Sequence, residues 1–296
     1  MRVLVVGATG TLGHRLCLEW AERFECYGTG REPVAAPVAD LLAGVTLIDG
    51  VSAERPESLG TAFQRARPEV VVNCIGAVKQ AEAGQQAVPA IRINSLFPHE
   101  LAALCGEQSA RMVHISTDCV FSGNRGNYNE DDVPDAIDIY GRSKLLGEVA
   151  GDGLLTLRTS LIGRELRGTL GLLEWLISNR GGSVRGFERA VFSGFTTRAL
   201  AAELAFLIEE HPELDGIWHL AAEPIDKLSL LTKLNDALEL GIEIVPDEDV
   251  VIDRSLDSSR LGHITGRRPP AWDDMVSELA ADETPYEEIR RELAHR

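Results

Sequence analysis

The first 160 residues alternate between short apolar runs and longer stretches with helical periodicity. The apolar runs, rich in β-branched residues, predict strands at 2–6, 26–30, 45–49, 70–75, 111–116 and 154–160. Helices are predicted between them, at 11–24, 56–66, 89–108 and from residue 140 onward. Strands that are apolar throughout are buried on both faces, and alternation with helices pairs them in parallel. We therefore predict an α/β fold with a doubly wound parallel sheet.

The pattern becomes less regular after residue 163. Helices are predicted near 169–179 and at 196–211, 226–240 and 272–281, with a strand at 216–221. The Rossmann-like domain is expected to comprise 1–163, with 191–222 returning to it. A smaller α/β substrate lobe is expected to comprise 164–190 and 223–296. The tail from residue 281 is expected to be a solvated helix or a frayed end.

A glycine-rich turn, GATGTLG at residues 7–13, follows the first predicted strand and opens the first predicted helix. Gly7 permits a tight turn, Gly10 lets the backbone approach a pyrophosphate, and Gly13 lets the helix pack close to the sheet. The helix N-terminus offers free N–H groups and the positive end of its dipole to a phosphate. This turn predicts a dinucleotide site.

The end of the second predicted strand bears on which dinucleotide is bound. Arg31 follows this strand, and no acidic residue lies within the five positions before it. NAD-binding enzymes usually place a carboxylate here for the ribose hydroxyls, whereas a cation accommodates the 2′-phosphate of NADP. A surface arginine is the alternative interpretation of Arg31. We predict NADPH as the cofactor, with NADH also possible.

Tyr140 and Lys144 are four residues apart at a helix start, so both side chains lie on one face. Hydride addition to a ketone leaves charge on oxygen, which a general acid must neutralise, and a free tyrosine has a pKa of about 10. A nearby lysine ammonium stabilises the phenolate and lowers that pKa. The same lysine can hold the nicotinamide ribose. The alternative is an amphipathic tyrosine beside a surface lysine.

Three motifs occur in order: the glycine turn, the segment STDCVF (116–121), and the Tyr-x-x-x-Lys pair in YGRSKLLGE (140–148). With LRTS (157–160) and SLDSSRL (255–261), they resemble the extended short-chain dehydrogenase/reductase superfamily, and within it the dTDP-4-dehydrorhamnose reductase group. Asn73 and Asn94 also fit that pattern. The resemblance covers essentially the whole chain.

The resemblance implies hydride transfer from NADPH to the 4-keto group of a nucleoside-diphospho-deoxyhexose. Thr117 would hydrogen-bond the substrate carbonyl, Tyr140 would protonate it, and Lys144 would tune Tyr140 and bind the ribose. The implied cofactor residues, besides Lys144, are Gly7, Thr9, Gly10, Thr11, Leu12, Gly13, Arg31, Asp49, Gly50, Cys74, Ile75 and Gly76. The implied substrate residues are Asp118, Cys119, Phe121 and Arg254.

Two positions depart from the family pattern. Cys119 replaces the tyrosine usual after Ser-Thr-Asp, and Leu161 replaces the tryptophan usual after Arg-Thr-Ser. Both lie in the expected sugar pocket, so a smaller pocket would suit a different 6-deoxy or 2-acetamido sugar. The arginine–proline pair of the family is also missing. Arg254 is either its replacement at the diphosphate or an exposed arginine.

Three other functions are alternatives to reduction of a sugar nucleotide. A 4,6-dehydratase needs Thr-Asp-Glu, whereas Cys119 stands in place of the glutamate, which argues against dehydration. A sugar-nucleotide 4-epimerase shares the Thr/Tyr/Lys set and typically retains NAD. A non-catalytic NADP-binding regulatory subunit is the third alternative.

The composition limits the classes of molecule that the protein is expected to bind. The net charge of −17 disfavours binding to nucleic acid or to a membrane surface. The five cysteines include no C-x-x-C pair, which indicates reduced thiols in a cytoplasmic protein. The histidines lack metal-ligand spacing, so no metal is predicted. A nucleotide sugar is the expected partner, and a homodimer is possible.

Overall fold

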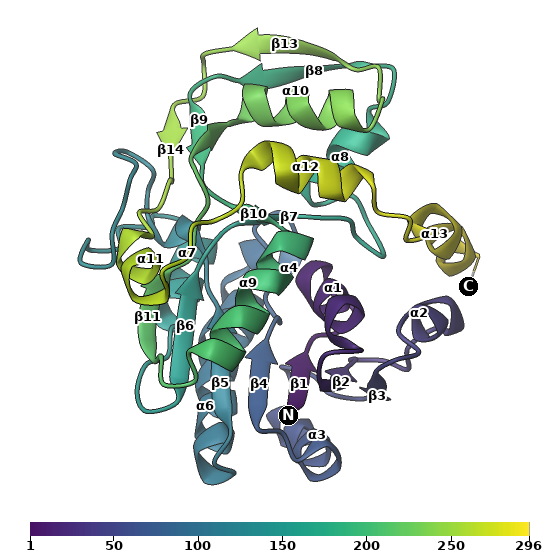
Figure 1. The fold of residues 1–296 in the computed structure, drawn as a ribbon, viewed down its shortest axis with the longest axis vertical. Helices are drawn as coiled ribbons and strands as arrows, with labels where there is room; N and C mark the ends of the chain where they lie inside the picture. The colour runs from purple at the N-terminus through teal and green to yellow at the C-terminus, as the bar shows by residue number, and fades with distance from the viewer. Residues whose placement is uncertain (296) are drawn as a thin grey trace.

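The computed structural model describes residues 1–295, and its centre is a seven-stranded sheet (Figure 1). The strand order is β3-β2-β1-β4-β5-β6-β11, and every neighbouring pair is parallel. The strands are β1 (Arg2–Val6), β2 (Glu25–Thr29), β3 (Thr46–Ile48), β4 (Val70–Asn73), β5 (Arg111–Ile115), β6 (Leu154–Arg158) and β11 (Gly216–His219). The predicted α/β class with a doubly wound parallel sheet is confirmed.

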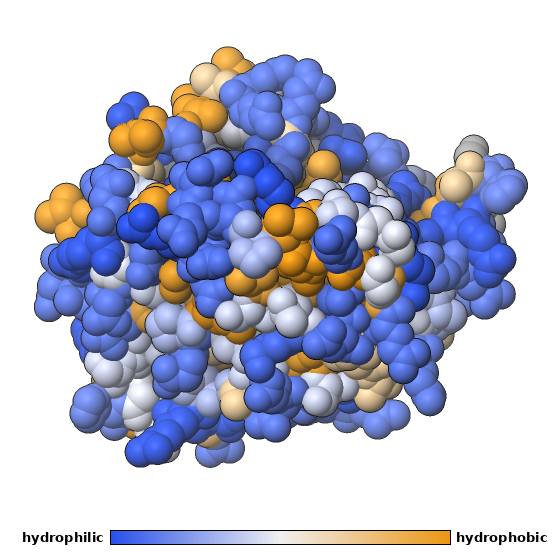
Figure 2. All heavy atoms as spheres, turned by 90° about the horizontal axis from the view of Figure 1, so that it is seen from above, coloured by the Kyte–Doolittle hydropathy of each residue, from blue (hydrophilic) through white to orange (hydrophobic). Residues whose placement is uncertain are grey.

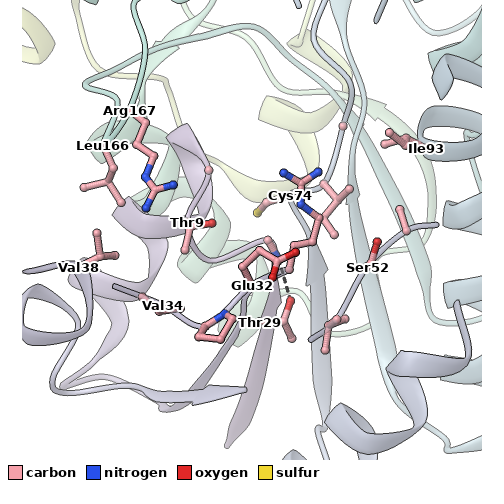
Figure 3. A pocket seen from close by; sticks show the side chains of 18 of the residues that line it. Thr9, Thr29, Glu32, Val34, Val38, Ser52, Cys74, Ile93, Leu166 and Arg167 are labelled. Carbon is pink, nitrogen blue, oxygen red and sulfur yellow. Dashed lines mark hydrogen bonds between the residues drawn. The ribbon is translucent and has the colours of Figure 1, made fainter. Parts of the chain in front are cut away.

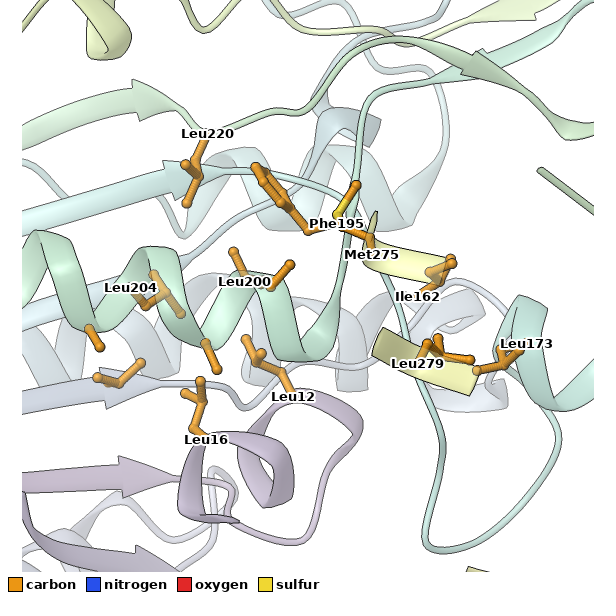
Figure 4. Packing of buried hydrophobic residues seen from close by; sticks show 14 of the residues in the cluster. Leu12, Leu16, Ile162, Leu173, Phe195, Leu200, Leu204, Leu220, Met275 and Leu279 are labelled. Atoms are coloured by element: carbon orange, nitrogen blue, oxygen red, sulfur yellow. The ribbon is translucent and has the colours of Figure 1, made fainter. Parts of the chain in front are cut away.

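Helices cover both faces of this sheet because successive strand side chains point to opposite sides. Val3 and Val5 of β1 belong to one core cluster, and Leu4 and Val6 to the other. The first cluster contains apolar residues of α1 (Thr11–Trp20) and α9 (Thr197–Glu210), whose leucines face each other in Figure 4. The second contains apolar residues of α3 (Leu59–Ala66) and α6 (Phe97–Glu107).

Two predicted helices begin differently from the sequence pattern. The helix predicted at 56–66 starts with a 3₁₀ turn, η1 (Pro56–Ser58), before α3. The one predicted at 89–108 is α5 (Ala87–Ala90), a π-helical stretch η2 (Ile91–Leu96) and then α6. Such wider turns often occur at functional sites. Here the π turn contains Asn94, whose side-chain amide bonds both backbone groups of Ala77.

A smaller lobe lies above the carboxyl ends of the main strands (Figure 1). Its strands pair as β12-β9-β14 and as β13-β8, and the pair β7-β10 lies between it and the main sheet. The strands are β7 (Leu161–Ile162), β8 (Ser183–Phe187), β9 (Ala190–Phe192), β10 (Phe195–Thr196), β12 (Ile225–Asp226), β13 (Glu243–Asp247) and β14 (Ile252–Asp253). Its helices include α8 (Leu172–Ser178), α10 (Lys227–Ala237) and α12 (Trp272–Ala280). The exact domain boundaries stay a prediction.

The C-terminal tail corrects one expectation. Residues 286–294 form α13 (Tyr286–Ala294), and Tyr286 and Ile289 are buried, so the helix is neither frayed nor fully solvated. Its apolar side packs into the core cluster that contains α1. Residue 296 lies outside the described residues. The short helices α2 (Ala36–Leu41), α4 (Glu82–Gln85) and α11 (Ser259–Thr265) were not predicted.

Hydrophilic side chains cover most of the face seen from above, and apolar side chains show through near its middle (Figure 2). Among residues 1–295, no helix has the length and apolar character needed to cross a membrane. The five cysteines are all unpaired.

Candidate functional site

Two cavities adjoin at the carboxyl edge of the sheet. The first, of about 430 Å³, lies over the glycine turn and the end of β2, and we call it the turn cavity. The second, of about 600 Å³, lies between the main sheet and the smaller lobe, and we call it the lobe cavity. Both are lined by Gly10, Cys74, Ile75 and Gly76, so they form one elongated site. An open sheet of this kind binds ligands at this edge.

The glycine turn has the geometry predicted from its spacing. Gly7 has a φ of +95°, and its N–H donates to Thr29 Oγ1 at 3.0 Å (Figure 3). A Cβ on Gly13 would lie 2.0 Å from the carbonyl oxygen of Gly7. The close packing of α1 against the turn therefore requires glycine at position 13. Thr9 and Gly10 line the turn cavity, and Thr11 and Leu12 line the lobe cavity.

The residues that follow β2 and β3 line the turn cavity only in part as predicted. Arg31 lines the turn cavity, as expected, but so does Glu32, which the sequence analysis did not consider. Asp49 and Gly50 do not line the cavity. Asp49 instead accepts a hydrogen bond from the Val34 N–H at 3.2 Å, which shapes the turn after β2. The residues that take their place are Val51, Ser52, Ala53 and Glu54.

The loop after β4 brings Cys74, Ile75 and Gly76 to the junction of the cavities, as predicted. Asn73 holds the loop by accepting the Ile75 N–H at 3.1 Å, and Asn94 accepts the Ala77 N–H at 2.8 Å. These two asparagines therefore fix the backbone of the loop.

Thr117 lies where β5 ends and begins the short 3₁₀ helix η3 (Asp118–Val120). Its hydroxyl accepts the Cys119 N–H at 3.1 Å and donates to Asp118 Oδ1 at 3.1 Å. The side chain is thus fixed at the wall of the lobe cavity, which it lines.

Helix α7 (Ile139–Leu146) brings Tyr140 and Lys144 to the same wall. Asp138 caps the helix by accepting the Gly141 N–H at 2.8 Å. A Cβ on Gly141 would lie 2.2 Å from the Cys119 carbonyl oxygen, so the first turn of α7 rests directly against η3. Lys144 Nζ donates to the Ile115 carbonyl at 2.8 Å. Thr117, Tyr140 and Lys144 are therefore brought together.

Burial dominates the electrostatics of these residues. It raises the pKa of the Tyr140 phenol, Cys119 and Asp118 add to this, and a hydrogen bond with Thr117 opposes it. Burial lowers the pKa of Lys144 to about 8. The expectation that Lys144 lowers the Tyr140 pKa is not met here, because burial and the acidic groups of Cys119, Asp118 and Asp138 dominate and raise that pKa.

Three of the four expected substrate residues, Asp118, Cys119 and Arg254, line the lobe cavity. Phe121 does not: its ring is fully buried and stacks on Tyr128 with centroids 4.2 Å apart. Phe121 contributes only its carbonyl, which accepts Arg254 Nε at 2.9 Å and so fixes the guanidinium.

The Cys119 thiol is not set up as a nucleophile. Burial raises its pKa to about 12, and the neighbouring Asp118 carboxylate adds to the effect. A thiol with so high a pKa stays protonated at neutral pH. Leu161, the other departure from the family pattern, also lines the lobe cavity.

Lys227 is a residue of the lobe cavity that the sequence did not reveal. It is the first residue of α10, and its Nζ lies 3.7 Å from the centroid of the Phe192 ring at the lobe cavity. Burial lowers its pKa to about 8, and Asp118 opposes the shift. The sequence placed Lys227 on a helix of the smaller lobe, with no motif to connect it to Thr117.

No group of three or more His, Cys, Asp or Glu side chains within the described part of the chain is arranged to hold a metal ion.

The comparisons with known proteins agree with this geometry. A family model described as the RmlD substrate binding domain matches residues 1–233. A dTDP-4-keto-6-deoxy-D-glucose reductase of Streptomyces niveus is 40% identical over 117 residues, covering 36% of this chain and 40% of that protein. A dTDP-4-dehydrorhamnose reductase of Burkholderia thailandensis is 33% identical over 167 residues, covering 55% and 50%. The chain thus matches half or less of these relatives.

A relative with a different role is also similar. Methionine adenosyltransferase 2 subunit beta of Danio rerio is 31% identical over 149 residues, covering 50% of this chain and 42% of that protein.

Solved structures share the fold over most of the chain. A hypothetical dTDP-4-dehydrorhamnose reductase of Sulfolobus tokodaii has a TM-score of 0.74 at 28% identity, covering 89% of this chain and 94% of that one. A dTDP-4-dehydrorhamnose reductase of Bacillus anthracis, in complex with NADP, has a TM-score of 0.74 at 21% identity, covering 94% and 98%. The family predicted from the motifs is confirmed, and this chain belongs to the RmlD substrate binding domain family of extended short-chain dehydrogenase/reductases.

Proposed function

We propose that the protein reduces the 4-keto group of a nucleoside-diphospho-deoxyhexose with NADPH. The observation that carries the proposal is the convergence of Thr117, Tyr140 and Lys144 on the lobe cavity, next to a turn cavity of dinucleotide type. Relatives named as reductases of 4-keto sugar nucleotides support the substrate class.

The residues of the turn cavity fit a dinucleotide. Thr9 and Gly10 line it at the N-terminus of α1, where backbone N–H groups and the helix dipole favour a phosphate. Arg31 at the end of β2 suits the 2′-phosphate of NADPH, while the neighbouring Glu32 is suited to the ribose hydroxyls of NADH. NADPH, when bound, supplies the hydride. The Bacillus anthracis relative in complex with NADP supports this cofactor, and NADH stays the alternative.

In the proposed mechanism, the Thr117 hydroxyl turns from Asp118 to donate a hydrogen bond to the ketone oxygen. Tyr140 then donates its phenolic proton to that oxygen as negative charge develops on it. The raised pKa of Tyr140 keeps this proton in place at neutral pH, as a proton donor requires. Lys144, one helical turn away, would hold the nicotinamide ribose with its ammonium, which is the other role expected of it.

The smaller side chains at Cys119 and Leu161 leave the sugar itself open. Relatives of the predicted family usually carry aromatic residues at these two positions, and both line the lobe cavity here. A 6-deoxy or 2-acetamido-deoxy sugar other than rhamnose is therefore among the proposed substrates.

The test is an NADPH-oxidation screen over 4-keto sugar nucleotides, with Tyr140→Phe as the variant. We expect kcat to fall by about 10²- to 10⁴-fold, because this is the range that a positioned general acid contributes. The dissociation constant for NADPH should stay unchanged.

Tyr27→Phe is the matched control, because Tyr27 lines neither cavity and, within residues 1–295, its phenol donates to Glu25. If Tyr140→Phe keeps the activity of Tyr27→Phe, the assignment of the proton donor is wrong.

A second candidate is a binding role beside a partner enzyme, which the similarity to methionine adenosyltransferase 2 subunit beta favours. NADPH would then raise the melting temperature, yet no 4-keto sugar nucleotide would be reduced. A 4-epimerase would instead retain NAD through dialysis, visible in the absorbance of the purified protein.

The homodimer and the cytoplasmic location stay predictions. Sedimentation of the purified protein tests the first, and cell fractionation tests the second.

A further inference from the structure

Besides Arg31, a second cationic side chain, that of Arg167, lines the turn cavity. Arg167 lies far along the chain from the glycine turn, yet its side chain extends toward Thr9 at this cavity (Figure 3). The guanidinium is exposed, and within residues 1–295 it takes part in no hydrogen bond or ion pair. Leu166 beside it is buried and also lines the cavity.

The segment that carries this arginine, residues 164–168, is tied down on both sides, and we call it the strap. Arg164 Nε donates to Glu174 Oε1 at 2.6 Å, and Glu174 also pairs with Arg290 of α13. Arg290 Nη2 donates to the Gly168 carbonyl at 2.6 Å, and its Nη1 donates to the Glu165 carbonyl at 3.4 Å. The backbone on either side of the exposed arginine is therefore bonded to α13.

The other end of α13 is linked to the glycine turn through His14 of α1. Burial lowers the pKa of His14 to about 4, so its imidazole is neutral and carries one N–H. Because the Gly10 carbonyl can only accept, His14 Nδ1 donates to it at 2.8 Å. Nε2 then accepts the Tyr286 O–H at 2.9 Å, and Arg15 Nη2 donates to the same hydroxyl at 2.8 Å. One helix thus holds both the turn and the strap.

We propose that Arg167 binds the diphosphate of the dinucleotide and that α13, through Arg290, holds it over the glycine turn. This proposal rests on the proposed cofactor site. The diphosphate is favoured over the 2′-phosphate because Arg167 extends toward Thr9 in the turn, whereas Arg31 follows β2 at the ribose end. The cavity also contains Glu32 and Glu54 in a chain of net charge −17, so an anionic ligand needs a local cation.

Equilibrium binding of NADPH and NADH to Arg167→Gln tests the first part. Both nucleotides carry the diphosphate, so we expect both dissociation constants to rise by about 10- to 100-fold, the range of one charge-assisted hydrogen bond. Arg31→Gln is the matched comparison, and it should weaken NADPH alone. Unchanged binding of both nucleotides to Arg167→Gln would overturn the proposal, and so would a loss confined to NADPH.

Arg290→Met tests the second part, with Arg291→Met as control because, within residues 1–295, the Arg291 guanidinium donates to the Glu287 carbonyl of the same helix. We expect Arg290→Met to weaken both nucleotides by about 3- to 10-fold, and to add nothing in the Arg167→Gln background, since the two residues act as one unit. Additive losses in the double variant, or no loss in Arg290→Met, would refute the anchoring role. Melting temperatures show whether each variant is folded.

Failure of the proposed function gives a different result. A wild-type protein that binds neither nucleotide would refute the cofactor site itself, whereas wild-type binding with an unaffected Arg167→Gln would refute only this inference.

Discussion

The two cavities of the site are built in opposite ways. The turn cavity is lined mostly by segments that directly follow β1, β2, β3 and β4, so neighbouring strands deliver its residues to one edge. The lobe cavity joins the ends of β5 and β6 to residues of β9, α10 and β14 from the smaller lobe. The first therefore depends on a repeated backbone pattern, whereas the second depends on packing between distant segments.

This difference decides what the sequence could predict. Glycine spacing reports local backbone geometry, so the turn residues and the pair Tyr140 and Lys144 could be placed from motifs alone. The loop at Cys74 was placed only through the resemblance to the family. Lys227 and Arg167 could not, because each reaches the site through long-range packing and lies in no motif. Phe121 was misplaced although it lies in the STDCVF motif, because its ring is buried against Tyr128 and does not line the lobe cavity.

The strand–helix alternation also predicted the main sheet but not the strands of the smaller lobe. Several of these, such as β12 and β14, contain two residues each. So short a run has no detectable period, and the pairing with partners far along the chain decides its structure.

The largest effect is expected from a substitution that disturbs the turn cavity and leaves the lobe cavity intact. Gly13→Ala places a methyl group against the Gly7 carbonyl, and we expect a loss of about 3 kcal/mol of unfolding free energy, with NADPH binding abolished. Chemical denaturation and nucleotide titration measure both quantities.

Gly60→Ala is the matched control, because Gly60 lies in α3 with open space at its Cβ position. It should gain about 0.5–1 kcal/mol. Equal effects of the two substitutions would show that the close approach at Gly13 carries no cost.

The next largest effect is expected from a substitution that changes the lobe cavity and leaves the turn cavity intact. Lys227→Met removes a cation from beside Asp118 and Cys119, and kcat/KM for the sugar nucleotide should fall by about 10- to 100-fold. The NADPH dissociation constant should not change.

Lys233→Met, on the same helix, removes only an exposed cation paired with Asp273 and should leave kcat/KM unchanged. If Lys227→Met weakens NADPH as much as it weakens the sugar nucleotide, the two cavities are not independent.

The smallest effect is expected from the titration of Lys144, which lines the lobe cavity. Because the pKa of Lys144 is about 8, its ammonium is lost as the pH rises through that value, and kcat/KM should fall to about half at pH 8. Lys227 has a similar pKa, so the fall must persist in Lys227→Met if Lys144 causes it.

Stability should change in the opposite direction over the same range. The folded state lowers the Lys144 pKa from 10.5 to about 8, so the unfolded chain binds more protons between these values. The contribution of this residue to stability therefore increases as the pH rises from 8 to 10.5. Parallel loss of activity and stability would indicate unfolding instead of deprotonation at the site.

The positions of the two chain ends decide where an affinity tag can be attached. Met1 is half exposed at the amino end of β1, on the side of the sheet away from both cavities (Figure 1). At the other end, α13 is bonded to the strap and is linked to the glycine turn through His14. An N-terminal tag therefore leaves the site undisturbed. A fusion attached directly after residue 296 would act on the helix that supports the site, and we expect it to bind nucleotides more weakly than the same 296 residues without the fusion.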